Sequence, residues 1–305
     1  MTGGEGFERR SFLAGLGLGA LACRSHVAPR SANPTQGASS ATRRLAELEK
    51  ETRGHIGVAA WDLASGVRFG YREHERFLFC STCKFPIAGA VLKRVDQGQE
   101  QLERRIAYDA SALLENCPIT SEHVAEGSMS VSALCEATIT TSDNAAGNLL
   151  LASVGGPAGL TNFLRSLGDS VSRLDRNEPD LNIYAPGDER DTTSPAAMLH
   201  TSHALLVSDQ VLSASSRQLL GEWLARASTG LRRLRSAFPT TFHSGDKTGT
   251  GDNGATNDIA IGWRAAGKPV LITAYSFGLP EDLDARSDVI GRVGRIAIDA
   301  LNVRS

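Results

Sequence analysis

The chain has 305 residues, of which 41% are hydrophobic and 22% charged, so it can bury a substantial core as one large domain or two interleaved lobes. Its formal net charge of −2 at pH 7 gives no electrostatic reason to expect nucleic acid or an anionic membrane surface as a partner. The composition is that of an ordinary soluble globular protein.

An export signal is predicted at the N-terminus, over residues 1–22. Paired arginines, Arg9 and Arg10, precede an apolar run of about a dozen residues, which is too short to span a bilayer. The run ends in Ala20-Leu-Ala22, an A-x-A cleavage pattern, and Arg-Arg-Ser-Phe-Leu resembles a twin-arginine signal, which exports folded proteins. We therefore predict an exported, periplasmic protein. Cys23 follows the cleavage pattern and leaves a lipid anchor open as an alternative.

The rest of the chain alternates between strand and helix patterns. Residues 23–40, rich in Ser, Ala and Pro, are predicted to form a flexible tether. An amphipathic helix is predicted over Arg43–Thr52, and a hairpin that turns at Ser65-Gly66 follows it. Helical patterns then dominate to about Ala227. Three strands and a final helix complete the chain, at residues 242–250, 257–265, 268–277 and 284–301.

Strands at both ends of the chain with helices between them predict an α/β (α+β) fold. An antiparallel sheet would be built from residues 41–80 and 228–305 and flanked by helices, with an all-helical domain, residues 81–227, inserted between them. The functional site is expected between the two lobes, where ligand sites commonly form.

The stretch FLFCSTCKF, residues 77–85, contains two overlapping motifs. Cys80 and Cys83 form a Cys-x-x-Cys pair, typical of thiol redox chemistry or metal binding, and Ser81 and Lys84 form a Ser-x-x-Lys pair. If Ser81 begins a helix, Lys84 lies one turn further on the same face, where its amine can activate the weak serine nucleophile. Cys83 would lie about 200° away and face the interior. Spacing alone does not decide between the two pairs.

Three further motifs follow in order. They are Ser142-Asp143-Asn144, then Glu178-Pro-Asp-Leu-Asn182, then Lys247-Thr248-Gly249. Together with Ser81 and Lys84, they resemble the signature of the class A serine β-lactamases, which share Ser-x-x-Lys, Ser-Asp-Asn and Lys-Thr-Gly. The resemblance extends from about Arg43 to the C-terminal helix. It implies that the Ser81–Lys84 pair carries the chemistry.

The resemblance implies hydrolysis of the β-lactam amide bond through an acyl-enzyme on Ser81. The backbone N–H groups of Ser81 and Thr250 would form the oxyanion hole, and Glu178 with Asn182 would activate the water that hydrolyses the ester. Either Lys84 or Glu178 would be the base for acylation, a choice that sequence cannot make. The expected substrates are penicillins and cephalosporins.

Further roles follow from the same resemblance. Ser142 would pass a proton to the leaving nitrogen, and Asn144 would bind the substrate's side-chain amide. The ring carboxylate would be held by one group of residues: Lys247, Thr248, Gly249, Thr250 and Arg233. Arg176 and Asp191 match an ion pair that closes the loop carrying Glu178, and this closure would place the hydrolytic water.

The cysteines depart from the family's patterns. Cys83 stands where Phe is common. Cys80 matches a cysteine that carbapenem-hydrolysing relatives bridge to the position after Lys-Thr-Gly-Thr, but Gly251 stands there. Cys135 matches a second disulfide framework, in which Ala88 occupies the partner's place. We therefore predict neither disulfide. Asn116 stands where an aromatic residue often lines the mouth of the site, which puts the substrate range in doubt.

Three other functions are compatible with individual motifs of the sequence. A penicillin-binding D,D-peptidase shares the serine motifs but does not need Glu178 and Asn182 as a deacylation apparatus. A thiol redox or zinc protein would use Cys80 and Cys83, and an inactive lactam-binding protein would be anchored through Cys23. The β-lactamase hypothesis implies a small-molecule substrate, no metal or organic cofactor, no obligate protein partner and a monomer.

Overall fold

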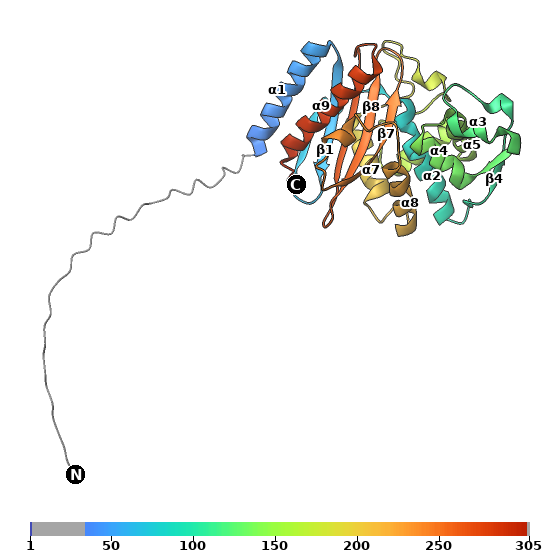
Figure 1. The fold of residues 1–305 in the computed structure, drawn as a ribbon, viewed down its shortest axis with the longest axis horizontal. Coiled ribbons are helices and arrows are strands. Elements are labelled where there is room, and N and C mark those ends of the chain that lie inside the picture. Colours follow the sequence, from blue (N-terminus) through green and yellow to red (C-terminus); the bar gives the residue numbers. More distant parts are fainter. Residues whose placement is uncertain (2–33, 304–305) are drawn as a thin grey trace. The chain divides into compact units, whose positions relative to one another are not determined.

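The computed structural model describes Met1 and residues 34–303; the predicted export signal and Cys23 lie outside the described residues. A five-stranded sheet forms the centre of the body, and every neighbouring pair of its strands is antiparallel. Figure 1 shows that strands from the N-terminal part of the described residues lie beside strands from the C-terminal part. The strands, in spatial order, are β2 (Arg68–Tyr71), β1 (His55–Asp62), β9 (Val270–Phe277), β8 (Thr256–Trp263) and β7 (His243–Thr250).

The predicted hairpin and the three C-terminal strands are confirmed. Gly66 adopts a φ of +76°, which suits a tight turn, and the Asp62 carboxylate accepts hydrogen bonds from Ala64 N and Ser65 Oγ there. β1 pairs along its whole length with β9, so that Val58 lies opposite Ala274. This long-range pairing fixes the N-terminal hairpin onto the C-terminal meander.

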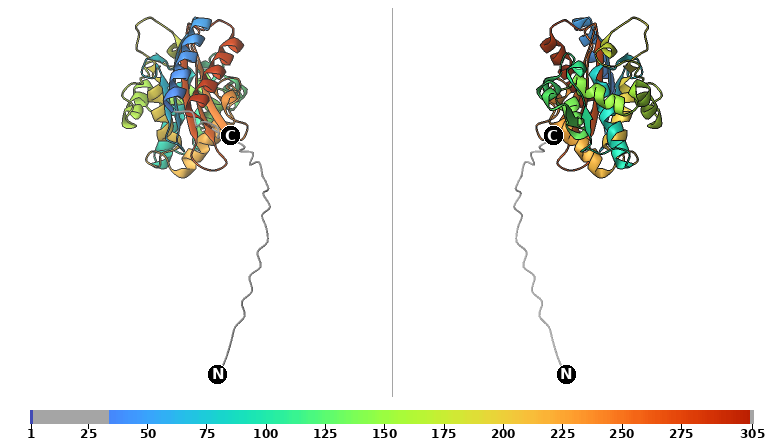
Figure 2. Two further views of the ribbon diagram at one scale, coloured as in Figure 1. Left: turned by 90° about the vertical axis from the view of Figure 1, so that its left-hand side faces the viewer. Right: turned by 90° about the vertical axis from the view of Figure 1, so that its right-hand side faces the viewer.

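One face of the sheet is covered by two long helices, α1 (Pro34–Thr52) and α9 (Leu283–Leu301), which lie side by side (Figure 2). Buried Leu45 and Leu48 pack with α9 and the sheet in one apolar cluster. The helix α1 begins at Pro34 rather than at Arg43, so the end of the predicted tether is helical. Proline is compatible with the first turn of a helix, and buried Ala41 extends the packed face towards it.

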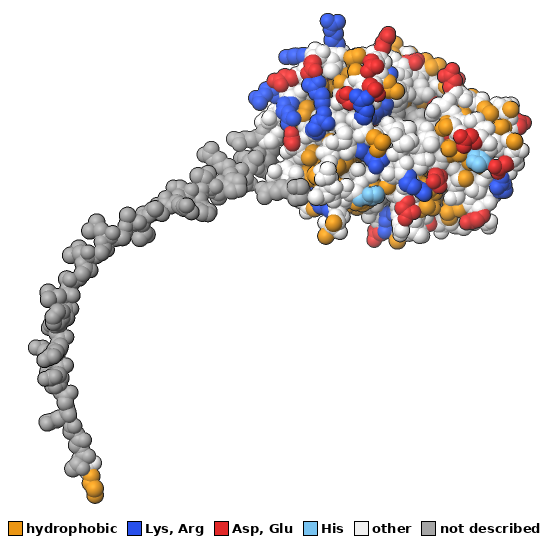
Figure 3. All heavy atoms as spheres, in the orientation of Figure 1, with side chains coloured by type: hydrophobic (Ala, Val, Ile, Leu, Met, Phe, Trp, Pro, Cys, Tyr) orange, Lys and Arg blue, Asp and Glu red, His pale blue; other side chains and the backbone are white. Residues whose placement is uncertain are grey.

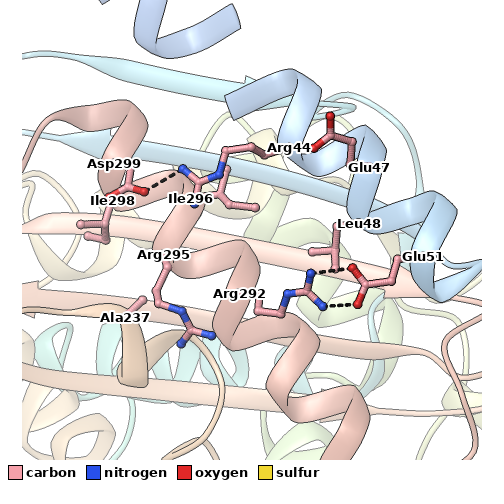
Figure 4. A pocket seen from close by; sticks show the side chains of 10 residues that line it. All are labelled: Arg44, Glu47, Leu48, Glu51, Ala237, Arg292, Arg295, Ile296, Ile298 and Asp299. Carbon is pink, nitrogen blue, oxygen red and sulfur yellow. Dashed lines mark hydrogen bonds and ion pairs between the residues drawn. The ribbon is translucent and has the colours of Figure 1, made fainter. Parts of the chain in front are cut away.

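The outer surface of these two helices carries charges of both signs (Figure 3). Two ion pairs join the helices: Arg44 to Asp299 at 2.7 Å and Arg292 to Glu51 at 2.6 Å. They flank a surface hollow of about 500 Å³ (Figure 4), which contains none of the predicted site residues. Exposed pairs of this kind contribute about 0–1 kcal/mol each, so the buried apolar face dominates the packing.

The other helices lie on the opposite side of the sheet and beyond its β7 edge. α7 (Pro195–Leu206) packs on β9 and β1, and α8 (Ala214–Ala225) packs against β7. α2 (Lys84–Asp96) contacts several neighbouring helices: α4 (Val131–Thr140), α5 (Asn144–Ser153), α6 (Gly156–Ser166), α7 and α8. These helices and the facing side of the sheet enclose a second apolar cluster.

Short elements complete the body. They are α3 (Pro118–Glu122), β3 (Phe77–Leu78) paired with β6 (Thr192–Thr193), and β4 (Arg105–Ala107) paired with β5 (Ser128–Ser130). The predicted α/β (α+β) class, with an antiparallel sheet flanked by helices, is confirmed. The division into an α/β domain and an inserted all-helical domain stays a prediction.

Candidate active site

Ser81 lies in a 3₁₀ turn, Cys80–Cys83, that leads directly into α2. The preceding residue, Cys80, has a φ of +47°, in the left-handed region that non-glycine residues enter at a cost of about 1–2 kcal/mol. Strained backbone of this kind gathers at functional sites, and Asn116 and Ser142 share it here. Ser81 Oγ lies 3.0 Å from Lys84 Nζ.

Lys84 is the centre of the site. Its side chain is fully buried, and its ammonium group has an ionic partner in Glu178 Oε1 at 3.0 Å. It also donates to four other acceptors: Ser81 Oγ, Ser142 O at 2.8 Å, Ser142 Oγ at 3.3 Å and Asn144 Oδ1 at 2.5 Å. A buried charge is stable only when it is paired and hydrogen-bonded, and Lys84 meets both conditions.

Glu178 faces Ser81 from the other side. It is only 5% exposed; Oε1 accepts a 2.8 Å hydrogen bond from Ser81 Oγ, and Oε2 accepts one of 2.6 Å from Asn182 Nδ2. Burial works to raise the pKa of Glu178, but the charge of Lys84 and the hydrogen bonds to the carboxylate outweigh it and leave the pKa below its ordinary value. Glu178 is therefore an ionised carboxylate in contact with a hydroxyl proton.

The loop that carries Glu178 is closed by Arg176 and Asp191. Arg176 Nε lies 2.5 Å from Asp191 Oδ2, and Asp191 Oδ1 accepts from the backbone N–H groups of Asp175 and Arg176. The side chain of Asp191 is fully buried, and donors reach both of its oxygens. The ion pair expected from the sequence is present. It joins the two ends of the loop that carries Glu178.

Asn148 is a site residue that the sequence analysis missed. Its side-chain amide accepts from Glu178 N at 3.0 Å and donates to Glu178 O at 2.9 Å, which fixes the backbone of Glu178. Asn148 follows Asn144 by one helical turn on α5. The pattern Asn-x-x-x-Asn was therefore a usable signal for two side chains on one face.

The Ser142-Asp143-Asn144 segment crosses between α4 and α5. Asp143 caps α5, because its side chain accepts a hydrogen bond from Ala146 N. It also accepts hydrogen bonds from Ile119 N and Thr120 N, and these contacts fix the segment. Its neighbour Asn144 uses both polar atoms of its side-chain amide. Oδ1 accepts a hydrogen bond from Lys84 Nζ, and Nδ2 donates one to a backbone carbonyl. Asn116 donates to Ser142 O at 2.9 Å, so its side chain turns towards this segment.

The opposite wall of the site is β7. Lys247 is fully buried, and its ammonium group donates to Ser142 Oγ at 3.0 Å and Thr248 O at 2.7 Å. Burial, followed by the charge of Lys84, lowers the pKa of Lys247 to about 7. A Cβ atom placed on Gly249 would lie 3.1 Å from Thr82 N, so the glycine permits close approach of β7 to the Cys80–Cys83 turn.

Arg233 is buried behind β7 rather than extended into solvent. Its guanidinium donates to Gly249 O at 2.9 Å, to Asn257 O at 2.8 Å and to Thr250 Oγ1 at 2.9 Å. Thr229, which the sequence analysis did not single out, shares a 2.7 Å hydrogen bond with Thr248 Oγ1.

The structure thus joins the hydrogen-bonded cluster of Ser81, Lys84 and Glu178 to the β7 wall. Ser142 makes the connection, because its Oγ contacts both Lys84 and Lys247.

The cysteines are buried and free within the described residues. Cys83 is fully buried, as its position on the helix predicted, and burial raises the pKa of both the Cys80 and Cys83 thiols. Buried thiols of high pKa are inert, which speaks against Cys-x-x-Cys redox chemistry. Nor do residues 34–303 contain a group of three or more His, Cys, Asp or Glu side chains that could hold a metal ion.

A family model described as the β-lactamase enzyme family matches residues 40–301. Similar proteins include β-lactamase L2 of Stenotrophomonas maltophilia, 44% identical over 87% of both chains, and β-lactamase AST-1 of Nocardia asteroides, 42% identical over 85% of this chain and 83% of the relative. The chain belongs to the class A β-lactamases. A solved class A β-lactamase, the last common ancestor of Gram-negative bacteria, has a TM-score of 0.83 and 53% identity over 86% of this chain and 99% of its own.

Membership of this family makes the protein a serine β-lactamase, a hydrolase of the β-lactam ring, as the four motifs predicted. The D,D-peptidase, thiol-protein and inactive-binder alternatives are set aside. In the part of the chain that the structure describes, no helix combines the length and apolarity that crossing a bilayer requires.

Proposed function

We propose that Ser81 attacks the β-lactam carbonyl carbon and that a single base takes its proton: either the Glu178 carboxylate, or Lys84 once its ammonium group has given a proton to Glu178. The Ser81 Oγ–carbon bond forms as the ring carbon–nitrogen bond breaks, and the proton reaches the leaving nitrogen through Ser142. The observation that carries this proposal is the contact of Ser81 Oγ with both groups, at 2.8 Å to Glu178 and 3.0 Å to Lys84. The backbone N–H groups of Ser81 and Thr250 serve as the oxyanion hole.

Hydrolysis of the acyl-enzyme needs a water that loses a proton as it attacks the ester carbon. We assign that base role to Glu178, with Asn182 as the second residue that holds the water. Asn182 Oδ1 is a buried acceptor that receives no hydrogen bond from the described residues, while its amide nitrogen is fixed on Glu178. A water molecule that donates a hydrogen bond to Asn182 Oδ1 would therefore lie next to the Glu178 carboxylate.

Recognition of the substrate falls to the β7 wall. Lys247, Thr248 and Thr250 are proposed to bind the ring carboxylate, with Gly249 allowing the close approach and Arg233 adding positive charge behind it. Asn144 is proposed to bind the substrate's side-chain amide, after exchanging one of its present contacts. Asn116, whose side chain donates to Ser142 O, stands where an aromatic residue often lines the mouth of the site, and the substrates that we propose are penicillins and cephalosporins.

Export to the periplasm is proposed from the N-terminal twin-arginine pattern, with Cys23 as a site where a lipid could be attached. No protein partner is needed for the chemistry, since the two walls come from one chain, and we propose a monomer.

The first experiment is time-resolved intact mass spectrometry of the wild type and Glu178→Ala, each mixed with benzylpenicillin. The wild type should return to its free mass as substrate is consumed, whereas Glu178→Ala should retain one penicilloyl adduct on Ser81. An adduct retained by both proteins would refute fast deacylation, and no adduct on either would refute Ser81 as the nucleophile. Asp180→Ala, in the same loop, is the matched control and should behave as the wild type.

A further inference from the structure

Two carboxyl groups lie buried beneath the β7 wall and take no part in the proposed reaction. Asp246 on β7 and Asp258 on β8 are both 0% exposed. Because Asp246 lies opposite Ala260 and Thr248 opposite Asp258, the two aspartates are diagonal neighbours on one face of the sheet. We call them the acid pair.

The loop of residues 228–238 rests on the acid pair. Leu234 N donates to Asp258 Oδ2 at 2.9 Å, and Arg235 Nη1 donates to Asp246 Oδ1 at 3.3 Å. The other two oxygens, Asp246 Oδ2 and Asp258 Oδ1, are buried and receive no hydrogen bond from any described residue. Each of these two fully buried carboxyl groups therefore receives a hydrogen bond from a single donor among the described residues.

A buried aspartate elsewhere in the same sheet shows what an ionised group requires. Asp62 on β1 receives donors from Ala64 N at 3.0 Å, Ser65 Oγ at 2.9 Å and Arg264 Nη1 at 3.0 Å. Although burial works to raise the pKa of Asp62, these bonds hold the pKa below its ordinary value. The acid pair lacks such donors, so two negative charges there would be poorly compensated.

Cations approach the acid pair from several elements but donate little to it. Arg233 and Arg235 come from the loop and Lys247 comes from β7. Arg286 of α9 and Cys80 lie close to Arg233. The guanidinium of Arg233 is used on other groups: Gly249 O, Asn257 O, Thr250 Oγ1 and Ser287 Oγ. The cations lower the cost of one negative charge without supplying the missing hydrogen bonds.

We infer that the acid pair holds a single shared proton at neutral pH, so that one carboxyl group donates to the other and the pair positions the substrate-carboxylate site. One added proton supplies a donor to a free oxygen and removes one of two buried charges. In agreement, burial raises the pKa of Asp246 to about 6, and burial together with the charge of Asp246 raises the pKa of Asp258 well above its ordinary value.

The consequence for catalysis rests on the function proposed above. Asp246 directly precedes Lys247 and Thr248, and the loop residues bound to the pair directly follow Arg233. The acid pair therefore ties both sides of the carboxylate site together. The pair's proton is retained on folding above the pH at which an unfolded aspartate, with a pKa of about 3.9, has lost it. This contribution to stability is lost as pH rises through the folded-state pKa.

Infrared difference spectroscopy of the full chain, without substrate, tests the shared proton directly. Between neutral and alkaline pH the wild type should lose a carbonyl band of a protonated carboxylic acid. The band should be absent from Asp258→Asn and from Asp246→Asn, and should persist in Asp62→Asn, the matched buried control. A wild type without the band at neutral pH, or a band that survives in both pair variants, would overturn the inference. Because no substrate is used, failure of the proposed reaction leaves this readout unchanged.

The positioning role is tested by the conservative variant. Asp258→Asn keeps a polar group that can bond both Leu234 N and Asp246, so its KM for benzylpenicillin at pH 7 should stay within about threefold of the wild type. Asp258→Ala should raise KM roughly tenfold with a smaller change in kcat, because the carboxylate site loses its support. Equal KM values for the wild type and Asp258→Ala would overturn the positioning role, with Asp246→Ala as the second variant.

Discussion

The two walls of the active site differ in how their buried lysines are compensated. Lys84 and Lys247 are both fully buried, but Lys84 lies 3.0 Å from the Glu178 carboxylate, whereas Lys247 contacts only a hydroxyl group and a backbone carbonyl. No carboxylate among the described residues lies within ion-pair distance of Lys247. In the free enzyme the buried charge of Lys84 is therefore balanced by a carboxylate. The charge of Lys247 has no such partner, and we propose that the carboxylate of the substrate supplies it.

We infer from this difference that the wall with Lys84 serves the reaction itself and the wall with Lys247 serves substrate binding. A compensated cluster keeps the reacting groups aligned before the substrate arrives, which is how preorganised sites lower the barrier. A buried cation with a pKa lowered to about 7 becomes more favourable when an anion binds beside it, so binding and protonation are coupled. Damage to the first wall should mainly affect kcat, and damage to the second mainly KM.

The largest effect is expected from Lys84→Met, which removes the cation of the compensated wall. Ser81 loses a hydrogen-bond partner and Glu178 loses its buried counter-charge, so kcat/KM for nitrocefin should fall roughly 10³–10⁴-fold. Stopped-flow absorbance measures it. Lys93→Met on the same helix, whose Nζ donates to Val211 O, is the control and should remain active. A fall of less than about tenfold would show that Glu178 alone is sufficient as the base.

Lys247→Met should act more weakly and mainly through KM. Loss of the unmatched cation is expected to lower kcat/KM about 10²-fold for a β-lactam with a free carboxylate, because a charge-assisted contact is lost. The same compound with an esterified carboxylate should be affected far less, and this difference is the decisive measurement. Lys268→Met, on an exposed loop, is the control. Equal losses for acid and ester would contradict the assignment of Lys247 to the carboxylate.

The pH dependence of KM should carry the signature of Lys247. Since its pKa lies at about 7, the cation is present below that pH and is lost as pH rises through it. KM for a carboxylate-bearing substrate should therefore rise above pH 7, approaching about tenfold per pH unit, and Lys247→Met should show no such rise. For stability the sign is opposite: the unfolded lysine keeps its proton to about pH 10.4, so the contribution of Lys247 to the free energy of unfolding should increase from pH 7 to 10, and the wild type should gain stability relative to Lys247→Met over this range. Calorimetry at fixed ionic strength checks this second trend.

The sequence predicted most of the fold and supplied the candidate reacting groups, because both depend on local pattern. The hairpin at Ser65-Gly66 and the three late strands follow from alternation and turn residues, and the four motifs carry Ser81, Lys84 and Glu178 directly. The start of α1 was placed too late, since a Ser- and Ala-rich segment has weak periodicity, and packing of Ala41 on the body extends the helix.

What the sequence could not supply depends on contacts between distant residues. The acid pair arises from the register of β7 against β8, and a shift of one residue would place the two side chains on opposite faces. The clamp of Asn148 on Glu178 joins positions 30 residues apart, and it exists only because the loop returns over α5. Such partners are set by tertiary packing, not by local propensity.

Asp191→Asn tests the support of the compensated wall without removing its chemistry. The amide keeps an oxygen for the backbone N–H groups but loses the ionic contact to Arg176, so the loop should loosen around Glu178. We expect acylation by benzylpenicillin to be preserved and deacylation to slow roughly tenfold, as single-turnover mass spectra would show. Asp188→Asn, which removes a pairing with Arg190 in the same loop, is the control. Unchanged kinetics for every substrate tested would refute a role for this ion pair in the reaction.

The smallest effect is expected from Gly251→Cys, which links the two walls covalently. A Cβ atom at position 251 would lie 2.7 Å from Cys80 Sγ, close to the separation across a disulfide, so a shift of a few tenths of an ångström should allow the bond. Under oxidation the variant should lose two free thiols relative to its reduced form, measured by alkylation and intact mass. Because both walls already lie in contact at Gly249, kcat should change by less than about threefold on oxidation. The control is Gly251→Ser, which tests the added side chain without the bond; a thiol count that oxidation leaves unchanged would show that the walls are further apart at this point.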